Sequence, residues 1–374
     1  MTEVLPKKRL LSLDVLRGIT VAGMIVVNNA GGRLSYDSLR HSAWNGMTPC
    51  DLVFPFFLFI MGISTYIALR KFHFEPSKTV VWKILKRTLL ILLIGIAIHW
   101  FDHICEGDFL PFAHLRLTGV LQRIALCYCA ASFLALYVPH KWMGWIAGIL
   151  LAGYGIFLLA ANGYVPDETN LLSVIDRAVL GVGHLYQKSP IDPEGLFSTL
   201  PSIAHTLIGF CCGRLIMETD TQEKKIVRLF VVGFLMMSVG FLLTEAFPLN
   251  KRIWSPTFAL TTCGLAAMFQ AMLMYFIDYK DKRRWCRFFE LFGVNPLFLY
   301  VLSEVLAIVI GVTGVKPPVY DMIHSLVANP YLASVVYSLL FMLLMAAAGY
   351  PLYKKKIYIN CLLYTSPSPR DYAA

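Results

Sequence analysis

The sequence predicts an all-α protein that crosses a membrane about ten times, and three observations lead to this fold class. First, 57% of the 374 residues are hydrophobic and 15% are charged, whereas a soluble globular domain carries about 25% charged residues. Second, the chain contains ten apolar runs of the roughly 20 residues that a helix needs to cross the hydrocarbon core. Third, Lys and Arg gather in alternate loops between these runs, which is typical of a multi-pass membrane protein.

The apolar runs are the predicted transmembrane helices. The first run is not expected to be a cleaved signal peptide, because it contains Asp14 and Arg17 and lacks a small-residue cleavage site. The longest stretch between runs, 161–197, is too short for a sizeable soluble domain. The runs cover residues 12–29, 50–69, 84–101, 118–137, 142–160, 198–217, 228–246, 255–277, 291–311 and 331–350.

The basic residues predict how the helices are oriented. Cytoplasmic loops of membrane proteins retain Lys and Arg, so the strongly basic loops are assigned to the cytoplasm, and both termini fall on that side. This bias, together with attraction to anionic lipid headgroups, explains the net charge of +10, and no nucleic-acid partner is expected. The basic segments are 7–9, 70–87, 141, 224–228, 280–287 and 354–356.

We expect a single transmembrane domain over residues 1–356. After the basic stop at 354–356 the chain becomes polar and rich in Pro and Ser, with no periodic pattern. Residues 357–374 resemble the translated adapter sequence that ends some assembled genes, and they are predicted to be disordered. Function is therefore expected among the helices and the outer loops.

The densest polar segment lies at residues 28–62, between the first two runs. Thr48 is a candidate N-cap, Pro49 fits the first helical position, and Asp51 lies where a capping box places an acid. The second helix is therefore predicted to begin here, with free backbone N–H groups at its positive end. Such a helix start suits the oxyanion that forms when a thioester or amide carbonyl is attacked.

His41 precedes this helix start, together with Trp44 and Asn45. Imidazole is available near neutral pH as a nucleophile or as a proton acceptor. A single loop histidine is more often an ordinary surface residue. Two observations favour a catalytic role for His41: its place at the membrane boundary and a family resemblance.

Six successive motifs resemble the heparan-alpha-glucosaminide N-acetyltransferase family and its bacterial relatives. They follow one another from Arg9 to about Lys356, which is nearly the whole predicted domain. The animal members carry an extra luminal domain and one more leading span, which are not found in this sequence. The motifs are RLLSLDVLRGITVAGMIVVNN, HSAWNGMTPCDLVFPFFLFIMG, LTGVLQRIALCY, DPEGLFSTLPSIAHTLIG, PLNKRIWSPTF and FGVNPLFLYVLSE.

The resemblance implies a transmembrane acyltransferase that moves an acetyl group from cytosolic acetyl-CoA to the amine of a glucosamine-type sugar at the outer face. It implies a place in the bacterial inner (plasma) membrane, and it makes a homodimer plausible because the family forms dimers. The family's essential histidine falls on His41 and its implicated asparagine on Asn28, and we add Asp51 as a third catalytic candidate. His41 either accepts the acetyl group or acts as a general base, and both roles stay open.

Other polar residues in these motifs are candidates for binding. On the outer side they are placed to hold the hydroxyls or ammonium of the sugar, although acids in outer loops are also ordinary solvated residues. Within the spans they are expected to face one cavity, because polar groups in lipid are costly, or else to make hydrogen bonds that pack helices together. The substrate-binding candidates are Trp44, Asn45, Asp192, Glu194, Asn250, Lys251 and Glu304, and the acetyl-CoA-binding candidates are Arg17, Gln122 and Arg123.

The position of His41 sets a geometric requirement. Acetyl-CoA is made in the cytosol, and His41 is expected at the outer side of a hydrocarbon core about 30 Å thick. We therefore expect a deep cavity open to the cytosol, with the loop 30–48 folded inward to meet the thioester. Asn295 before Pro296 marks an expected helix irregularity, which membrane proteins tolerate where backbone lines a cavity.

Two helical spacings have competing explanations. Asp14 and Arg17 are three residues apart, which favours a structural ion pair over contact of Arg17 with a phosphate. His99 and His103 are four apart, as in a helical metal-binding pair. The spacing fixes no third ligand and the resembled family is not metal-dependent, so no metal is predicted and acetyl-CoA is the expected co-substrate.

A secondary transporter of a sugar or small solute is the alternative function. Ten spans with buried charges suit a transporter as well, but no convincing five-plus-five internal repeat is found in the sequence. A non-catalytic scaffold would leave the polar segment 28–51 without a role. The enzyme hypothesis predicts that His41→Ala impairs acetyl transfer, whereas a transporter would tolerate the change.

Overall fold

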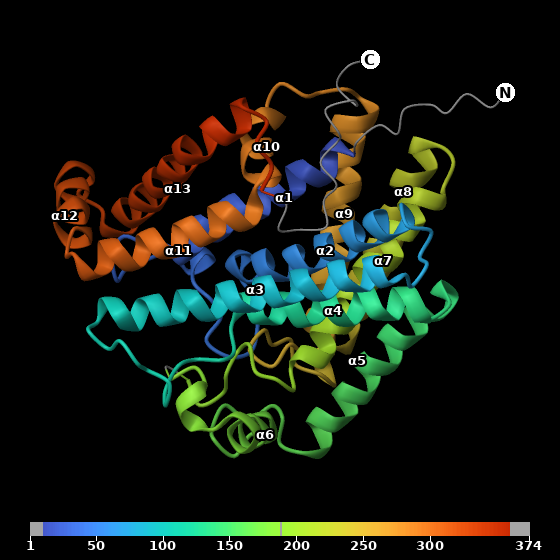
Figure 1. The fold of residues 1–374 in the computed structure, drawn as a ribbon, viewed down its shortest axis with the longest axis horizontal. Coiled ribbons are helices and arrows are strands. Elements are labelled where there is room, and N and C mark those ends of the chain that lie inside the picture. Colours follow the sequence, from blue (N-terminus) through green and yellow to red (C-terminus); the bar gives the residue numbers. More distant parts are fainter. Residues whose placement is uncertain (1–9, 188, 360–374) are drawn as a thin grey trace.

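The computed structural model describes residues 10–187 and 189–359, and this part of the chain forms helices and no β-strand. The predicted fold class, an all-α multi-pass membrane protein, is confirmed (Figure 1). The helices of the first half are α1 (Leu11–Asn28), α2 (Val53–Arg70), α3 (Lys78–Cys105), α4 (Val120–Tyr137), α5 (Met143–Ala160), α6 (Leu171–Leu180) and α7 (Thr199–Glu218).

The second half contains a helix pair that is sharply bent. α10 and α11 meet at an angle of 80°, with Asn295 between them and Pro296 at the first position of α11, so the predicted irregularity is confirmed. The side-chain amide of Asn295 bonds the backbone of Ile357 and Ile359 at 2.9 and 2.7 Å. The helices are α8 (Gln222–Leu242), α9 (Pro256–Leu273), α10 (Cys286–Val294), α11 (Pro296–Val312), α12 (Lys316–Val327) and α13 (Pro330–Lys354).

The number of membrane spans differs from the prediction. Each of the ten predicted runs falls on a helix, but by length and apolar composition eight helices of the described part could cross a membrane, or nine if the bent pair counts as one span. The predicted run 84–101 lies on α3, a helix of 28 residues that is not among these. The cytoplasmic placement of both termini stays a prediction, as does disorder of the tail, of which 360–374 lie outside the described residues.

Backbone contact between α2 and α7 holds the centre of the bundle together. A Cβ atom at Gly62 would lie 2.1 Å from a carbonyl oxygen of α7, and one at Gly209 would lie 2.3 Å from a carbonyl oxygen of α2. Small residues allow membrane helices to approach this closely. α1 and α10 cross in the same way at Gly18 and Gly293. The helix that begins at the polar loop therefore has little freedom to shift.

Asp14 and Arg17 form a buried ion pair inside this packing, with Nη1 of Arg17 at 3.2 Å from the aspartate. The guanidinium also donates to the Ser64 hydroxyl of α2 at 2.9 Å and to the Gly293 carbonyl of α10 at 3.3 Å. Burial of a charged pair is tolerated when its remaining donors are satisfied. The contacts of Arg17 therefore match the structural alternative, and its contact with acetyl-CoA stays a prediction.

Residues 161–198 form a small unit outside the bundle, which we call the lobe. It contains α6 and the short 3₁₀ helix η4 (Val182–His184) and lies at the bottom of Figure 1. Hydrogen bonds tie it to neighbouring loops: Trp44 reaches Tyr164, and Arg116 reaches Asp192. The α1–α2 loop, the α3–α4 loop and the lobe thus share one end of the bundle, which we call the His41 end.

Candidate active site

The α2 segment begins as the sequence predicts, with a 3₁₀ turn η2 (Pro49–Leu52) that leads directly into α2. Thr48 is the N-cap, and it forms a capping box with Asp51. The Asp51 carboxylate Oδ2 accepts hydrogen bonds from the backbone N–H of Thr48 at 3.0 Å and of Ser42 at 3.2 Å. One buried carboxylate therefore fixes both the start of the helix and the return of the preceding loop.

His41 is held by the other oxygen of the same carboxylate. Its Nδ1 lies 2.7 Å from Oδ1 of Asp51, which is fully buried, whereas the His41 side chain is 51% exposed. A carboxylate that accepts the Nδ1–H proton selects the tautomer whose Nε2 lone pair is unprotonated. The exposed Nε2 is then the atom of this pair that is available for chemistry.

Lys251 and Cys50 complete the surroundings of the imidazole. Nζ of Lys251 lies 3.2 Å from Oδ1 of Asp51 and 2.9 Å from Nδ1 of His41. The Cys50 sulfur lies 3.1 Å from the same nitrogen. Lys251 thus places a positive charge against both the buried carboxylate and the imidazole. Lys251 is a predicted sugar-binding residue, and its contact with His41 and that of Cys50 do not follow from the sequence motifs.

The turn before α9 brings Lys251 to the loop. Gly46 donates its N–H to the Leu249 carbonyl at 2.7 Å, and the Asn250 amide donates to Asn45 at 3.2 Å. Asn250 is buried and also accepts the backbone N–H of Arg252 at 2.8 Å. Asn45 and Asn250, both named as sugar-binding candidates, contact each other here.

Trp44 joins the loop to the lobe. Its indole N–H donates to the Tyr164 carbonyl at 2.9 Å, and its ring packs on a buried apolar cluster that includes Tyr154, Leu158 and Leu172. Arg252 makes a second connection, because its Nη1 donates to the Ser189 hydroxyl at 3.0 Å. The lobe is therefore tied to the loop of His41 through Trp44 and to the turn before α9 through Arg252.

Asn28 and Glu304 are brought together from positions 276 residues apart in the chain. Nδ2 of Asn28, the last residue of α1, donates to Oε1 of Glu304 on α11 at 3.2 Å. A catalytic candidate and a substrate-binding candidate thus form one pair. In the described part of the chain no hydrogen bond joins this pair to His41.

Gln122 and Arg123 open α4 but point to different neighbours. The Gln122 amide lies against Gly95 of α3 and Gly119. Arg123 donates through Nη2 to the Gly195 carbonyl at 3.0 Å and to the Ser198 hydroxyl, and its guanidinium lies 5.3 Å from the Trp254 ring centre. Arg123 thereby links α4 to the start of α7, and the acetyl-CoA contacts predicted for both residues stay predictions.

Asp192 and Glu194 share one arginine. Nη2 of Arg116 lies 2.9 Å from a carboxylate oxygen of each, and the Thr118 hydroxyl also donates to Asp192. Burial would raise the pKa of the Asp192 carboxyl, but Arg116 and these hydrogen bonds hold it below its usual value. Asp192 is therefore a buried, ionised residue of the lobe, and Arg116 balances its charge.

The lobe contains a cleft of about 550 Å³. Asp176 of α6 lines it, and Oδ1 of this residue accepts the backbone N–H groups of Leu196 and Phe197 at 3.0 and 3.3 Å. Burial nevertheless raises the pKa of Asp176 to about 6. The other lining residues are Pro166, Asp167, Glu168, Ser173, Arg177, Val182, Leu185, Tyr186, Gln187, Ser189, Pro190 and Asp192.

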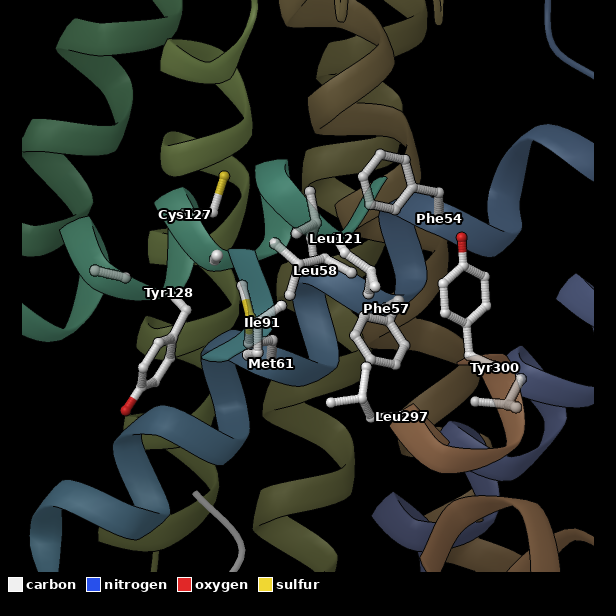
Figure 2. Close-up of a cluster of buried hydrophobic side chains, with 14 of the residues drawn as sticks. Phe54, Phe57, Leu58, Met61, Ile91, Leu121, Cys127, Tyr128, Leu297 and Tyr300 are labelled. Carbon is white, nitrogen blue, oxygen red and sulfur yellow. The ribbon is translucent and has the colours of Figure 1, made fainter. Parts of the chain in front are cut away.

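A second, much smaller cavity lies between α1, α2, α3, α4 and α11. Its volume is about 10 Å³, and apolar side chains close around it. Figure 2 shows Phe57 of α2, Ile91 of α3 and Leu297 of α11 meeting at this place, with Tyr300 beside them. A void of this size holds about one water molecule, so it is not the expected deep cavity open to the cytosol, which stays a prediction. The expected inward fold of the loop 30–48 is limited, because most of its residues are exposed.

We predict that Asp176→Asn stabilises the protein more at about pH 8 than at about pH 5. Because the raised pKa means that the folded state binds this proton more tightly than the unfolded chain, the stability of the wild type falls as pH rises from about 4 through 6. Asn keeps an oxygen for the two N–H groups and has no proton to lose. Thermal melting of the detergent-solubilised protein at both pH values checks this.

The matched control is Asp220→Asn, at an exposed aspartate that follows α7 at the other end of that helix. Its melting temperature, relative to wild type, should change little between the two pH values. A gain from Asp176→Asn that is the same at both pH values would contradict the burial argument.

Comparison with known proteins connects this site to a family. Residues 9–240 match the family described as "Heparan-alpha-glucosaminide N-acetyltransferase, catalytic". The chain is 28% identical over 355 residues to the human heparan-alpha-glucosaminide N-acetyltransferase, covering 79% of this chain and 53% of that protein. For the Mus musculus protein of the same name the identity is 28% over 357 residues, covering 80% and 54%. The chain thus spans about half the length of the curated relatives it matches. The resemblance seen in the motifs is confirmed, and the chain belongs to the heparan-alpha-glucosaminide N-acetyltransferase catalytic family.

Proposed function

We propose that this protein is a membrane-embedded acyltransferase that moves an acetyl group from acetyl-CoA to the amine of a glucosamine-type sugar. The observation that carries the proposal is the half-exposed His41 imidazole, held at 2.7 Å by the buried Asp51 carboxylate. The curated relatives are named as N-acetyltransferases of heparan-alpha-glucosaminide. An oriented imidazole is the group that such a transfer needs, either as nucleophile or as base.

His41 acts through Nε2, and two routes are compatible with its geometry. In the direct route, Nε2 takes a proton from the sugar amine as the amine nitrogen attacks the thioester carbon, and the C–S bond then breaks to release CoA. In the two-step route, Nε2 itself attacks the thioester, CoA leaves, and the amine later displaces the imidazole. In both routes Asp51 keeps Nδ1 protonated and the ring in place.

Lys251 supports either route electrostatically. Its ammonium lies 3.2 Å from Asp51 and 3.4 Å from Nε2 of His41. A fixed positive charge next to the reacting nitrogen stabilises the negative charge that develops on the thioester oxygen. The same charge offsets the cost of burying the Asp51 carboxylate.

The donor is proposed to approach from the opposite end of the bundle. Basic loops mark that end as cytoplasmic, in the inner membrane of a bacterium, so acetyl-CoA must pass between helices to reach the His41 end. The small apolar cavity at Phe57, Ile91 and Leu297 lies among α1, α2, α3 and α11. This cavity holds no more than about one water molecule, so entry of the acetyl-pantetheine arm requires α11 to move away from α3 and polar groups of the helices to bond its amides.

The acceptor is proposed to bind in the cleft of the lobe. Its volume of about 550 Å³ is in the range of small-molecule sites. Four carboxylates line it; Arg116 pairs with Asp192 and Arg177 with Glu168, each at 2.9 Å, which leaves two carboxylates in excess. A cationic amino sugar is the ligand class that this charge pattern favours. The links from Trp44 and Arg252 then couple an occupied cleft to the loop of His41.

We predict that His41→Ala lowers the rate of acetyl transfer at least about 100-fold, because general base catalysis alone is worth that much. Transfer from labelled acetyl-CoA to glucosamine oligosaccharides by the purified protein measures the effect. His324→Ala on α12 is the control, and it should leave the rate unchanged. Absence of transfer by the wild type to any amino sugar, together with sugar flux in proteoliposomes that lack acetyl-CoA, would favour a transporter instead.

Leu297→Trp should abolish acetyl-CoA binding, because a larger side chain fills the narrow passage between α2, α3 and α11. Leu340→Trp is the control, since Leu340 of α13 is 51% exposed on the bundle surface. Binding of radiolabelled acetyl-CoA to the solubilised variants gives the answer. Unchanged affinity in Leu297→Trp would show that the donor takes another path.

Glu168→Gln should raise the KM for the amino-sugar acceptor by up to roughly tenfold, because the cleft loses one of the charges that attract a cationic ligand. The change removes a negative charge and leaves Arg177 uncompensated in the cleft. The KM for acetyl-CoA should not change. Asp220→Asn alters charge equally at the other end of α7 and serves as the control. If both KM values stay at the wild-type level, the acceptor binds elsewhere and the role of His41 is unaffected.

A further inference from the structure

Three potential metal ligands converge where α3 ends, outside the site described above. His103, Asp108 and His114 each place one ligand atom so that all three atoms lie within 4.8 Å of one another. We call these residues the His103 cluster. They belong to one short segment at the His41 end, but the sequence spacing gives no regular pattern that would group them.

The backbone at the end of α3 brings Asp108 back to His103. Gly107 has a φ of +94°, a left-handed conformation that glycine adopts without steric cost. Its N–H bonds the Ile104 carbonyl at 3.0 Å, and the N–H of Asp108 bonds the His103 carbonyl at 2.9 Å. This pair of bonds is a Schellman motif. The helix terminus therefore fixes Asp108 next to His103.

A second turn returns His114 to the same point. The N–H of His114 bonds the Pro111 carbonyl at 3.0 Å, and its Nε2 lies 2.7 Å from Oδ2 of Asp108. The rings of His103 and His114 are 5.1 Å apart between centres. The Trp100 indole N–H donates to the Phe109 carbonyl at 3.0 Å and anchors the intervening loop to α3.

We propose that the His103 cluster binds one divalent transition-metal ion of the Zn²⁺ type. Two imidazoles and one carboxylate are ligands that Zn²⁺ prefers, and three protein ligands leave a position for water. At zinc-ligand distances of about 2.0–2.1 Å, two ligand atoms of a tetrahedral site are roughly 3.3 Å apart. Side-chain rotations that change the distances between the three ligand atoms by up to about 1.5 Å therefore complete the site. Asp102 and Glu106 add negative charge on the same turn of α3.

The sequence spacing pointed to a different pair. His99 and His103 are four residues apart on α3. The Nε2 atom of His99, however, lies against Gly119, where an added Cβ would be 2.9 Å away. The third ligand comes instead from a turn of the loop. A bound ion would tie the end of α3 to the segment that continues to Arg116, and thereby to the lobe. Its role is structural and separate from acetyl transfer.

The test uses full-length protein purified without a polyhistidine tag and stripped with a chelator. Titration with Zn²⁺ against a chromogenic indicator should show one ion bound per chain. His103→Asn and His114→Asn should each weaken binding at least about tenfold, since even residues behind the ligands commonly contribute that much. Co²⁺ should give visible ligand-field absorption in the wild type and lose it in both variants.

His324→Asn is the matched control, because it removes an imidazole from α12 at a different surface. It should bind Zn²⁺ as the wild type does. The His114 side chain is 52% exposed, so its replacement should leave the fold intact, which gel filtration checks. Absence of stoichiometric binding by the wild type overturns the proposal, and so does equal affinity in His114→Asn or an equal loss in His324→Asn.

Discussion

The active end of this protein depends on one buried carboxylate. Asp51 caps the segment that becomes α2 through Oδ2 and holds His41 through Oδ1. A carboxylate with no exposed surface is tolerated because backbone N–H groups, the imidazole and Lys251 satisfy it together. The same carboxylate therefore serves the helix start and the His41 imidazole, and removing it would affect both.

Close helix packing holds the Asp51–His41 interaction in place. α2 lies in backbone contact with α7 at Gly62 and Gly209, so the Asp51 carboxylate has a fixed position relative to the rest of the molecule. Preorganised groups stabilise a transition state without further reorganisation. The bent α10–α11 pair and the small apolar cavity beside α11 are the places where the proposed entry of the donor requires movement.

Local features were predictable from the sequence, and distant pairings were not. The capping box at Thr48 and Asp51, the Asp14–Arg17 pair and the break at Asn295 each follow from residues a few positions apart. Lys251 reaches His41 across 210 residues only because Gly46 and Leu249 bond through their backbones.

The outer-loop acids show the same limit. Asp192 and Glu194 both pair with Arg116, a residue of another loop, and their predicted contact with a sugar stays a prediction. One cavity was predicted for three polar residues of the spans, but each contacts different partners. Gln122 lies against Gly95, Arg123 bonds Gly195, and Glu304 bonds Asn28. Sequence alone gives the chemistry available to such residues, whereas helix packing decides which of them meet.

The lobe has a consequence for how such a protein can diversify. It lies between α5 and α7 in the chain, it meets the loop of His41 through Trp44 and the turn before α9 through Arg252, and it contributes no atom to the His41–Asp51 pair. With the acceptor bound in the lobe, as proposed, replacing this segment by one of different shape and charge changes the acceptor that is recognised and leaves the His41–Asp51 pair as it is.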